Sequence, residues 1–445
     1  MGEGARTAGR MPVSPKASGG FYGWKLLAVF WFILLVNLSF PMAGSSLLIT
    51  EMARSFRFSR EELGLPFSVY FGVIGLSSPL VALLIGRLGI RATLVLGNLS
   101  LAVGAVALAT IARTPAALVL WFGIVIGFAV ASGGNLTTQT AIPRWFVRRR
   151  AFAYAVILTA SAVGGMLIAP ILTAFIKASP EGWRHGWWLL AALATLAAIL
   201  AGLFVRERPE DVGQHSDGDQ APVQADTVTP AARPAPLPFG AIAARADFWA
   251  IILASAAITA AMSLVISHGV ANALDAGHSH VETGWALALY AVAGLAGKIL
   301  VGVLGDRFNP AYIWAGLLFP TAIGLLVAAF AIGGVGLYFY AIAAGCGLGG
   351  VVVGQPATIA RRFDVVSFAR VASLMFLFQA IAGVFVPTLA GWFFTAEAGY
   401  RWSFVLTALG CVLSALLLIG TCRGEKGRVG PAGTGENRAG NENSA

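Results

Sequence analysis

The chain has 445 residues, of which 58% are hydrophobic and only 11% are charged, and its mean hydropathy is +0.79. This composition excludes a soluble globular protein. Apolar runs of about twenty residues cross a bilayer as helices, because a helix satisfies its own backbone hydrogen bonds, so we predict an all-α membrane protein. The net charge of +10 comes from basic residues in short loops rather than on one face, which indicates membrane topology rather than a nucleic-acid partner.

Twelve apolar runs predict twelve transmembrane helices. They span residues 25–50, 63–85, 92–112, 117–140, 151–176, 186–205, 248–273, 283–304, 311–333, 336–358, 370–395 and 402–421. The first run is too long for the core of a signal peptide and lacks a small-residue cleavage site, so we expect it to be retained.

Polar segments flank and divide these helices. Residues 1–24 and 422–445 are predicted to be tails, and residues 206–247, rich in Pro, Asp, Gln and Ala, are predicted to be a solvated linker. The linker separates two predicted six-helix bundles, residues 25–205 and 248–421.

The basic residues predict the orientation in the membrane. Of the 30 Lys and Arg residues, 22 fall on the side that holds both termini and 7 on the other side, while Lys298 lies inside a helix. The positive-inside rule therefore predicts a protein of the cytoplasmic membrane with both termini in the cytoplasm.

The two halves repeat the same landmarks. Pro170 precedes Arg184 by 14 residues, and Pro387 precedes Arg401 by 14 residues. Related sequences, IGRLGIR and LGDRFNP, follow the second and eighth helices. We therefore predict a duplicated six-helix unit, which is typical of transporters that rock two pseudo-symmetric halves around a site at the membrane midplane.

The loop after the eighth helix carries a recognisable motif. Gly302, Asp306 and Arg307 match Gly-x-x-x-Asp-Arg-x-Gly, with Asn309 at the last position, and this pattern resembles the signature of the major facilitator superfamily. The resemblance implies the major facilitator fold and a gating role for these three residues. We expect Asp306 and Arg307 to make polar contacts with the neighbouring end of the eleventh helix or its loop, and thereby to hold one access state.

The loop after the second helix carries a changed copy of the same motif. Arg87, Gly89 and Arg91 are present, but Ala82 and Gly86 replace its Gly and Asp. The resemblance assigns Arg87 and Arg91 to conformational control. The carboxylate with which the family locks its two halves together is missing from this copy.

Three further runs resemble the monocarboxylate porter and oxalate:formate antiporter branch of this superfamily. They are WFVRRRAFA at 145–153, FYGW at 21–24 and RPEDVG at 208–213. The resemblance implies a secondary transporter that moves a small organic anion, with a monocarboxylate as the favoured class and a proton or an exchanged anion as the coupled species.

Lys298 is the charged residue of the eighth helix. A central Lys costs about 2.5–3.5 kcal/mol to insert, so such a residue usually faces a cavity or a partner. The branch carries Arg four residues before the glycine that opens the loop motif, and Lys298 stands four residues before Gly302. We expect Lys298 to bind the substrate carboxylate as a point charge rather than as a bidentate fork, with a hydrated cavity lysine as the alternative.

Three uncharged or weakly basic residues complete the candidate set. Asn37, near Pro41 in the first helix, is a candidate ligand, although a helix-to-helix hydrogen bond explains it equally well. Gln379 corresponds by resemblance to a lysine in the eleventh helix of oxalate carriers. His268 is a candidate for proton coupling, with an interfacial histidine that bonds a neighbour as the alternative.

Drug efflux and neutral-solute transport are the alternative transport functions. A carrier of cations would use an acidic residue within a helix, and the predicted helix cores contain no Asp or Glu, which argues against cations as substrates. A transporter-like receptor would use a folded cytoplasmic module. His278, His280 and Glu282 resemble a metal cluster only by composition, and no nucleophile, phosphate loop or cofactor motif appears, so we predict neither an enzyme nor a cofactor.

Overall fold

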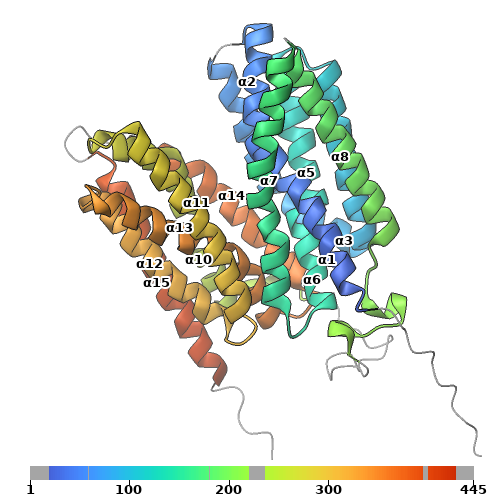
Figure 1. Cartoon of the computed structure of the whole chain (residues 1–445). Helices are drawn as coiled ribbons and strands as arrows, with labels where there is room; N and C mark the ends of the chain where they lie inside the picture. Colours follow the sequence, from blue (N-terminus) through green and yellow to red (C-terminus); the bar gives the residue numbers. More distant parts are fainter. Residues whose placement is uncertain (1–19, 59, 180, 220–235, 394–398, 427–445) are drawn as a thin grey trace, which may run out of the picture.

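The computed structural model describes residues 20–58, 60–179, 181–219, 236–393 and 399–426. These residues form two bundles of long helices, as predicted, which meet in the lower part of Figure 1 and diverge upward. The predicted tails fall largely outside the described residues.

The N-terminal bundle contains six spanning segments, several of them interrupted. They are α1 (Gly23–Leu34), η1 (Leu35–Gly44) and α2 (Ser45–Phe56); α3 (Arg60–Thr110); α4 (Pro115–Leu118), η2 (Val119–Ile126), α5 (Gly127–Gly133) and α6 (Asn135–Trp145); α7 (Arg150–Ala178); and α8 (Gly182–Phe204).

The C-terminal bundle has six long helices, and three short elements lie between the bundles. The long helices are α10 (Ala246–Asp275), α11 (His280–Leu304), α12 (Pro310–Phe330), α13 (Val335–Arg362), α14 (Phe368–Trp392) and α15 (Arg401–Lys426). The short ones are η3 (Pro209–Val212), η4 (Ser216–Gly218) and α9 (Phe239–Ala243).

Gly89 divides α3 into the predicted second and third helices. Eleven helices in the described residues are long and apolar enough to cross a membrane, because the 47 residues Gly64–Thr110 count as one. A straight helix of that length would measure about 70 Å, more than twice the roughly 30 Å of the hydrocarbon layer. The backbone breaks at Gly89 (φ 85°, ψ 172°), a conformation open to glycine, so the chain crosses twelve times.

Two spanning segments contain breaks of their own. The first becomes π-helical at residues 35–44 around Pro41, which has no N–H to donate. The fourth is interrupted at Gly134, whose φ of −122° and ψ of −117° end α5 and begin α6. Such breaks leave backbone groups that polar neighbours must satisfy.

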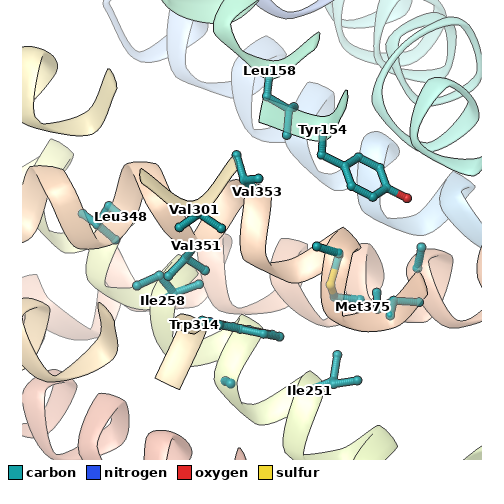
Figure 2. Close-up of a cluster of buried hydrophobic side chains, with 14 of the residues drawn as sticks. Tyr154, Leu158, Ile251, Ile258, Val301, Trp314, Leu348, Val351, Val353 and Met375 are labelled. Carbon is teal, nitrogen blue, oxygen red and sulfur yellow. The ribbon is translucent and has the colours of Figure 1, made fainter. Parts of the chain in front are cut away.

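The halves contact each other along two edges. On one edge α3 packs against α14, and on the other edge α7 packs against α11 and α13. At the first edge Gly75 lies so close to Ala380 that any side chain would overlap it. Figure 2 shows Tyr154 and Leu158 of α7 together with Val353 and Met375 of the other half, and all four belong to one buried cluster.

The start of α1 and the end of α15 lie on the same face, which we call the termini face. The Tyr22 hydroxyl donates to the Phe204 carbonyl at 2.8 Å, and Arg362 donates to Thr421 at 2.7 Å. The ends of α8 and α13 therefore share this face, and we call the opposite one the far face. The bundles meet toward the termini face and diverge toward the far face (Figure 1).

The predicted linker is not solvated throughout. In residues 206–219 the Asp217 side chain is only 4% exposed, and in the part that precedes α10 the Ile242 side chain is fully buried. Asp217 binds backbone amides of the N-terminal bundle, whereas residues 236–247 apart from Ile242 are exposed or half-buried. Residues 220–235 lie outside the described residues.

Candidate functional site

Lys298 lies at the junction of the two halves. Its Nζ donates to the Ser161 hydroxyl at 3.0 Å and to the Leu158 carbonyl at 3.3 Å, and both acceptors belong to α7. An ammonium group has three N–H donors, so these two neutral acceptors leave one donor for a further partner. Within the described part of the chain, no Asp or Glu forms an ion pair with Lys298.

The glycines of α11 explain why Lys298 faces α7. Lys298, Gly302 and Gly305 recur at spacings of four and three residues, which places them on one face of the helix. A Cβ at Gly302 would lie 2.4 Å from Ala155 Cβ, and a Cβ at Gly305 would lie 2.6 Å from Ala151 Cβ. This face of α11 therefore packs closely against the α7 backbone. Lys298 lies on the same face of α11, nearer the far face than Gly302 and Gly305.

Asp306 lies at the termini-face end of the contact between α11 and α7. Its Oδ1 accepts from the Ala151 N–H at 2.7 Å and its Oδ2 from the Phe152 N–H at 3.1 Å. These donors belong to the first turn of α7, whose N-cap residue Arg149 supplies no side-chain acceptor. Asp306 thus caps, from the other half, a helix that has no cap of its own.

The contact corrects our prediction for the loop motif. Asp306 binds the start of the fifth helix instead of the eleventh, because the close α11–α7 crossing brings the α7 amides to it. Arg307 is exposed, and its side chain makes no polar contact with the described residues. Burial raises the pKa of the Asp306 carboxyl above its ordinary value, while the two amide donors act in the opposite direction.

Arg150 adds a further hydrogen bond between the halves. Its Nη1 donates to the Ala360 carbonyl of α13 at 2.9 Å, and its Nε donates to the Phe146 carbonyl at 2.8 Å. Polar contacts between the halves therefore extend from Lys298 to the termini face.

The changed motif in the first half has a different partner. Glu207 accepts from the Arg91 N–H at 2.9 Å and pairs with Arg144 at 2.9 Å, while the Arg87 side chain is exposed. Gly89 gives Glu207 room, since a Cβ there would lie 2.6 Å from its Oε1. Glu207 thus links segments of one half. Sequence reasoning missed it because Glu207 lies 116 residues from Arg91.

Asn37 lies within the N-terminal bundle and is not a hydrogen-bond partner of Lys298. It is fully buried, and its amide donates to the Ile33 carbonyl and to Asn98 Oδ1, both at 2.9 Å. Asn98 in turn donates to the Gly133 carbonyl at 3.0 Å, beside the break in the fourth segment. Helix-to-helix bonding, the alternative left open above, accounts for these contacts.

The structure places Gln379 and His268 in the C-terminal bundle. Gln379 is half-buried on α14, one residue before Ala380, and forms no hydrogen bond with the described residues. The His268 ring lies 4.6 Å from the Tyr400 ring, toward the far face. Neither residue joins the Lys298 contacts.

The outer-loop cluster has structural contacts. His278 Nε2 bonds the Ile332 carbonyl at 2.7 Å, and Glu282 forms a capping box with Ser279 at the start of α11. The described residues contain no group of three or more His, Cys, Asp or Glu side chains arranged to hold a metal.

Two six-helix bundles joined by closely packed helix pairs, with a lysine at their junction, define a membrane transporter of the two-bundle type. The chain belongs to the Major Facilitator Superfamily, which it matches over residues 29–270 and 270–440. This finding confirms the predicted fold class, and the relatives described below are transporters rather than enzymes.

Relatives include several monocarboxylate transporters. Monocarboxylate transporter 12 of Rattus norvegicus is 21% identical over 424 residues, covering 90% of this chain and 85% of that protein. Monocarboxylate transporter 4 of the same species is 24% identical over 414 residues, covering 92% and 84%. These matches agree with the resemblance drawn from the three sequence runs.

Solved structures share the fold. The transporter FucP in its outward conformation superposes with a TM-score of 0.71 at 15% identity, covering 90% of this chain and 99% of that one. The proton:xylose symporter XylE superposes with a TM-score of 0.68 at 14% identity, covering 90% and 95%.

Proposed function

We propose that the protein is a secondary transporter that moves a small organic anion, with a monocarboxylate as the favoured class, across the cytoplasmic membrane. The observation that carries the proposal is Lys298, a basic residue at the junction of the halves whose described partners are a carbonyl and a hydroxyl. The printed names of the monocarboxylate-transporter relatives support the same class. The excess of basic residues in the loops on the side of the termini supports a cytoplasmic position for both termini.

In this proposal the substrate carboxylate supplies the negative charge that Lys298 lacks. The carboxylate accepts a hydrogen bond from the third N–H of the Lys298 ammonium. It also competes with the Leu158 carbonyl and the Ser161 hydroxyl for the other two N–H donors. A compact ammonium constrains the charge of a bound group and its distance from Nζ more strictly than it constrains the orientation of that group. Such a site suits several small carboxylates that differ in shape.

Alternating access follows from the position of Lys298. Its partners lie on the opposite half, so an anion bound there contacts both halves and responds to their relative motion. Asp306 and the Gly302 crossing hold the termini face closed in the present state, and their release opens that face while the far face closes.

The coupled species is a co-transported proton or an exchanged anion. The His268 ring packs against the Tyr400 ring and is not a hydrogen-bond partner of Lys298, so coupling through the substrate's own charge is favoured over direct relay between these two residues. Replacing His268 with Gln should leave the pH dependence of transport unchanged under this route, and a lost pH dependence would instead assign proton coupling to His268.

Replacing Lys298 tests the proposal directly. We expect Lys298→Gln in proteoliposomes to weaken binding of organic anions roughly 10- to 100-fold, the loss of a charge-assisted hydrogen bond, while Lys298→Arg retains part of the activity. Lys177→Gln, on an exposed lysine of α7, is the matched control. Undiminished uptake of every anion by Lys298→Gln, with protein level and fold confirmed, would remove Lys298 from the site.

The same assay separates the alternative substrates. Drug efflux or neutral-solute transport predicts that Lys298→Gln leaves transport of amines or sugars intact and that organic anions do not stabilise the purified protein. A thermal-shift screen against organic acids, amines and sugars identifies the class before any flux measurement.

A further inference from the structure

The segment between α6 and α7 is an unusual stretch of backbone. It turns from the extended Phe146 (φ −119°, ψ 122°) to Arg149 (φ −112°, ψ 33°) without a glycine or a proline. Its four side chains are a phenylalanine, a valine and two arginines, none of which offers a hydrogen-bond acceptor. The amide groups of this stretch and of the first turn of α7 therefore depend on acceptors from elsewhere in the chain.

Residues 216–219, which we call the clasp, supply acceptors for the first part of this stretch. Asp217 Oδ2 accepts from the Val147 N–H at 3.1 Å and from the Arg148 N–H at 2.8 Å. The Arg148 side chain also pairs with Asp219, and the Ser216 hydroxyl donates to the Arg144 carbonyl at 3.3 Å.

Asp217 is held at an energetic cost. Its φ of 58° is in the left-handed region, and its side chain is only 4% exposed. Its second carboxylate oxygen, Oδ1, is buried without a hydrogen-bond partner among the described residues. A strained, buried and half-satisfied carboxylate indicates a role beyond simple solvation of the loop.

The clasp is fixed to the N-terminal half. A Cβ at Gly218 would lie 3.1 Å from Phe21 Cβ, and Gln214, two residues before the clasp, accepts from the Tyr22 N–H at 2.8 Å. The Asp217 contacts join residues of this half only, so they persist when the halves move apart. The Asp306 contacts cross between the halves and break when the termini face opens.

Two carboxylates therefore hold successive amide pairs of one backbone stretch. Asp217 binds the amides of residues 147 and 148 from within the N-terminal half, and Asp306 binds the amides of residues 151 and 152 across the junction of the halves. We propose that Asp217 is a positioning residue for the closure of the termini face. By fixing the backbone of residues 147 and 148, it holds the first turn of α7 in the position in which the amides of residues 151 and 152 can bind Asp306.

A double-mutant cycle tests the proposal without any substrate, so its outcome does not depend on the proposed function. Asp217→Gly removes the carboxylate, and glycine adopts a φ of 58° without strain. Spin labels at Leu88→Cys and Val366→Cys, on exposed side chains of the two halves, report the opening of the termini face by distance measurement. The native cysteines are replaced with alanine in all variants.

We expect Asp217→Gly to shift the population roughly 2- to 10-fold toward the opened termini face, and to have no further effect in an Asp306→Ala background. Asp219→Gly is the matched control: it adds the same backbone freedom to the clasp and removes one charge, but leaves the amide acceptor in place, and it should not shift the population.

Equal shifts with and without Asp306, or no shift in either background, would overturn the proposal. A comparable shift in Asp219→Gly would also overturn it, because clasp flexibility would then suffice. Asp217→Asn keeps one carbonyl acceptor and tolerates the left-handed region, so the same cycle is run on it if the glycine variant fails to fold. A smaller shift that also vanishes without Asp306 is then expected.

Discussion

Replacing Gly302 with alanine should weaken the closure of the termini face. The added Cβ would lie 2.4 Å from Ala155 Cβ, whereas unstrained carbon atoms pack at about 3.5–4.0 Å, so the helices must separate by roughly 1 Å or more. Asp306 follows α11, so its 2.7 Å bond to the Ala151 amide would lengthen beyond hydrogen-bond distance. Overpacking of this kind costs about 1–3 kcal/mol, which corresponds to roughly a 5- to 150-fold shift toward the opened state.

The distance assay with labels at Leu88 and Val366 measures this shift. Ala155→Gly removes the only atom that the new methyl would meet within 3.5 Å, so the double variant Gly302→Ala/Ala155→Gly should recover the parent distribution. Gly316→Ala is the control on α12, because a Cβ there meets no atom within 4 Å. An unchanged distribution in Gly302→Ala, or a shift that Ala155→Gly does not reverse, would refute the steric reasoning.

Three smaller predictions concern other contacts. Asn98→Ala should lower the free energy of unfolding by about 1–3 kcal/mol, because Asn37 loses its buried partner; a thermal melt in detergent that matches the parent would contradict this. Glu207→Gln breaks the half-buried pair with Arg144 and should cost about 1 kcal/mol, measured in the same way and diminished at high salt. Ser161→Ala should change the apparent affinity for organic anions less than Lys298→Gln does, and an equal loss would assign Ser161 a larger share of the site.

Much of the fold followed from local patterns. Apolar length gave the twelve segments, and the polar interval around Gly89 marked a turn that the backbone dihedral angles confirm. Hydrophobicity did not predict the π-helical stretch around Pro41 or the break at Gly134, because both depend on side chains that satisfy the freed backbone groups.

The candidate site was harder to predict, since its geometry depends on packing between distant segments. Lys298 stood out by its charge, but its partners Leu158 and Ser161 lie 140 and 137 residues away. The sequence correctly predicted that Asp306 makes polar contacts, but the predicted partner was wrong. Its partners are the backbone amides of Ala151 and Phe152, and a backbone amide is not marked by any residue type in the sequence. The clasp around Asp217 was missed because its polar composition resembles a solvated linker.

The capping of α7 by a residue of the other half has an electrostatic consequence. When Asp306 withdraws, the first turn of α7 loses its acceptors, and the positive end of its dipole faces water beside the arginines at 148–150. We expect this end of the helix to attract anions from solution in that state, so a higher concentration of multivalent anions should favour the opened termini face. The balance between the two states would then respond to the ionic composition of one compartment, even for ions that are not transported.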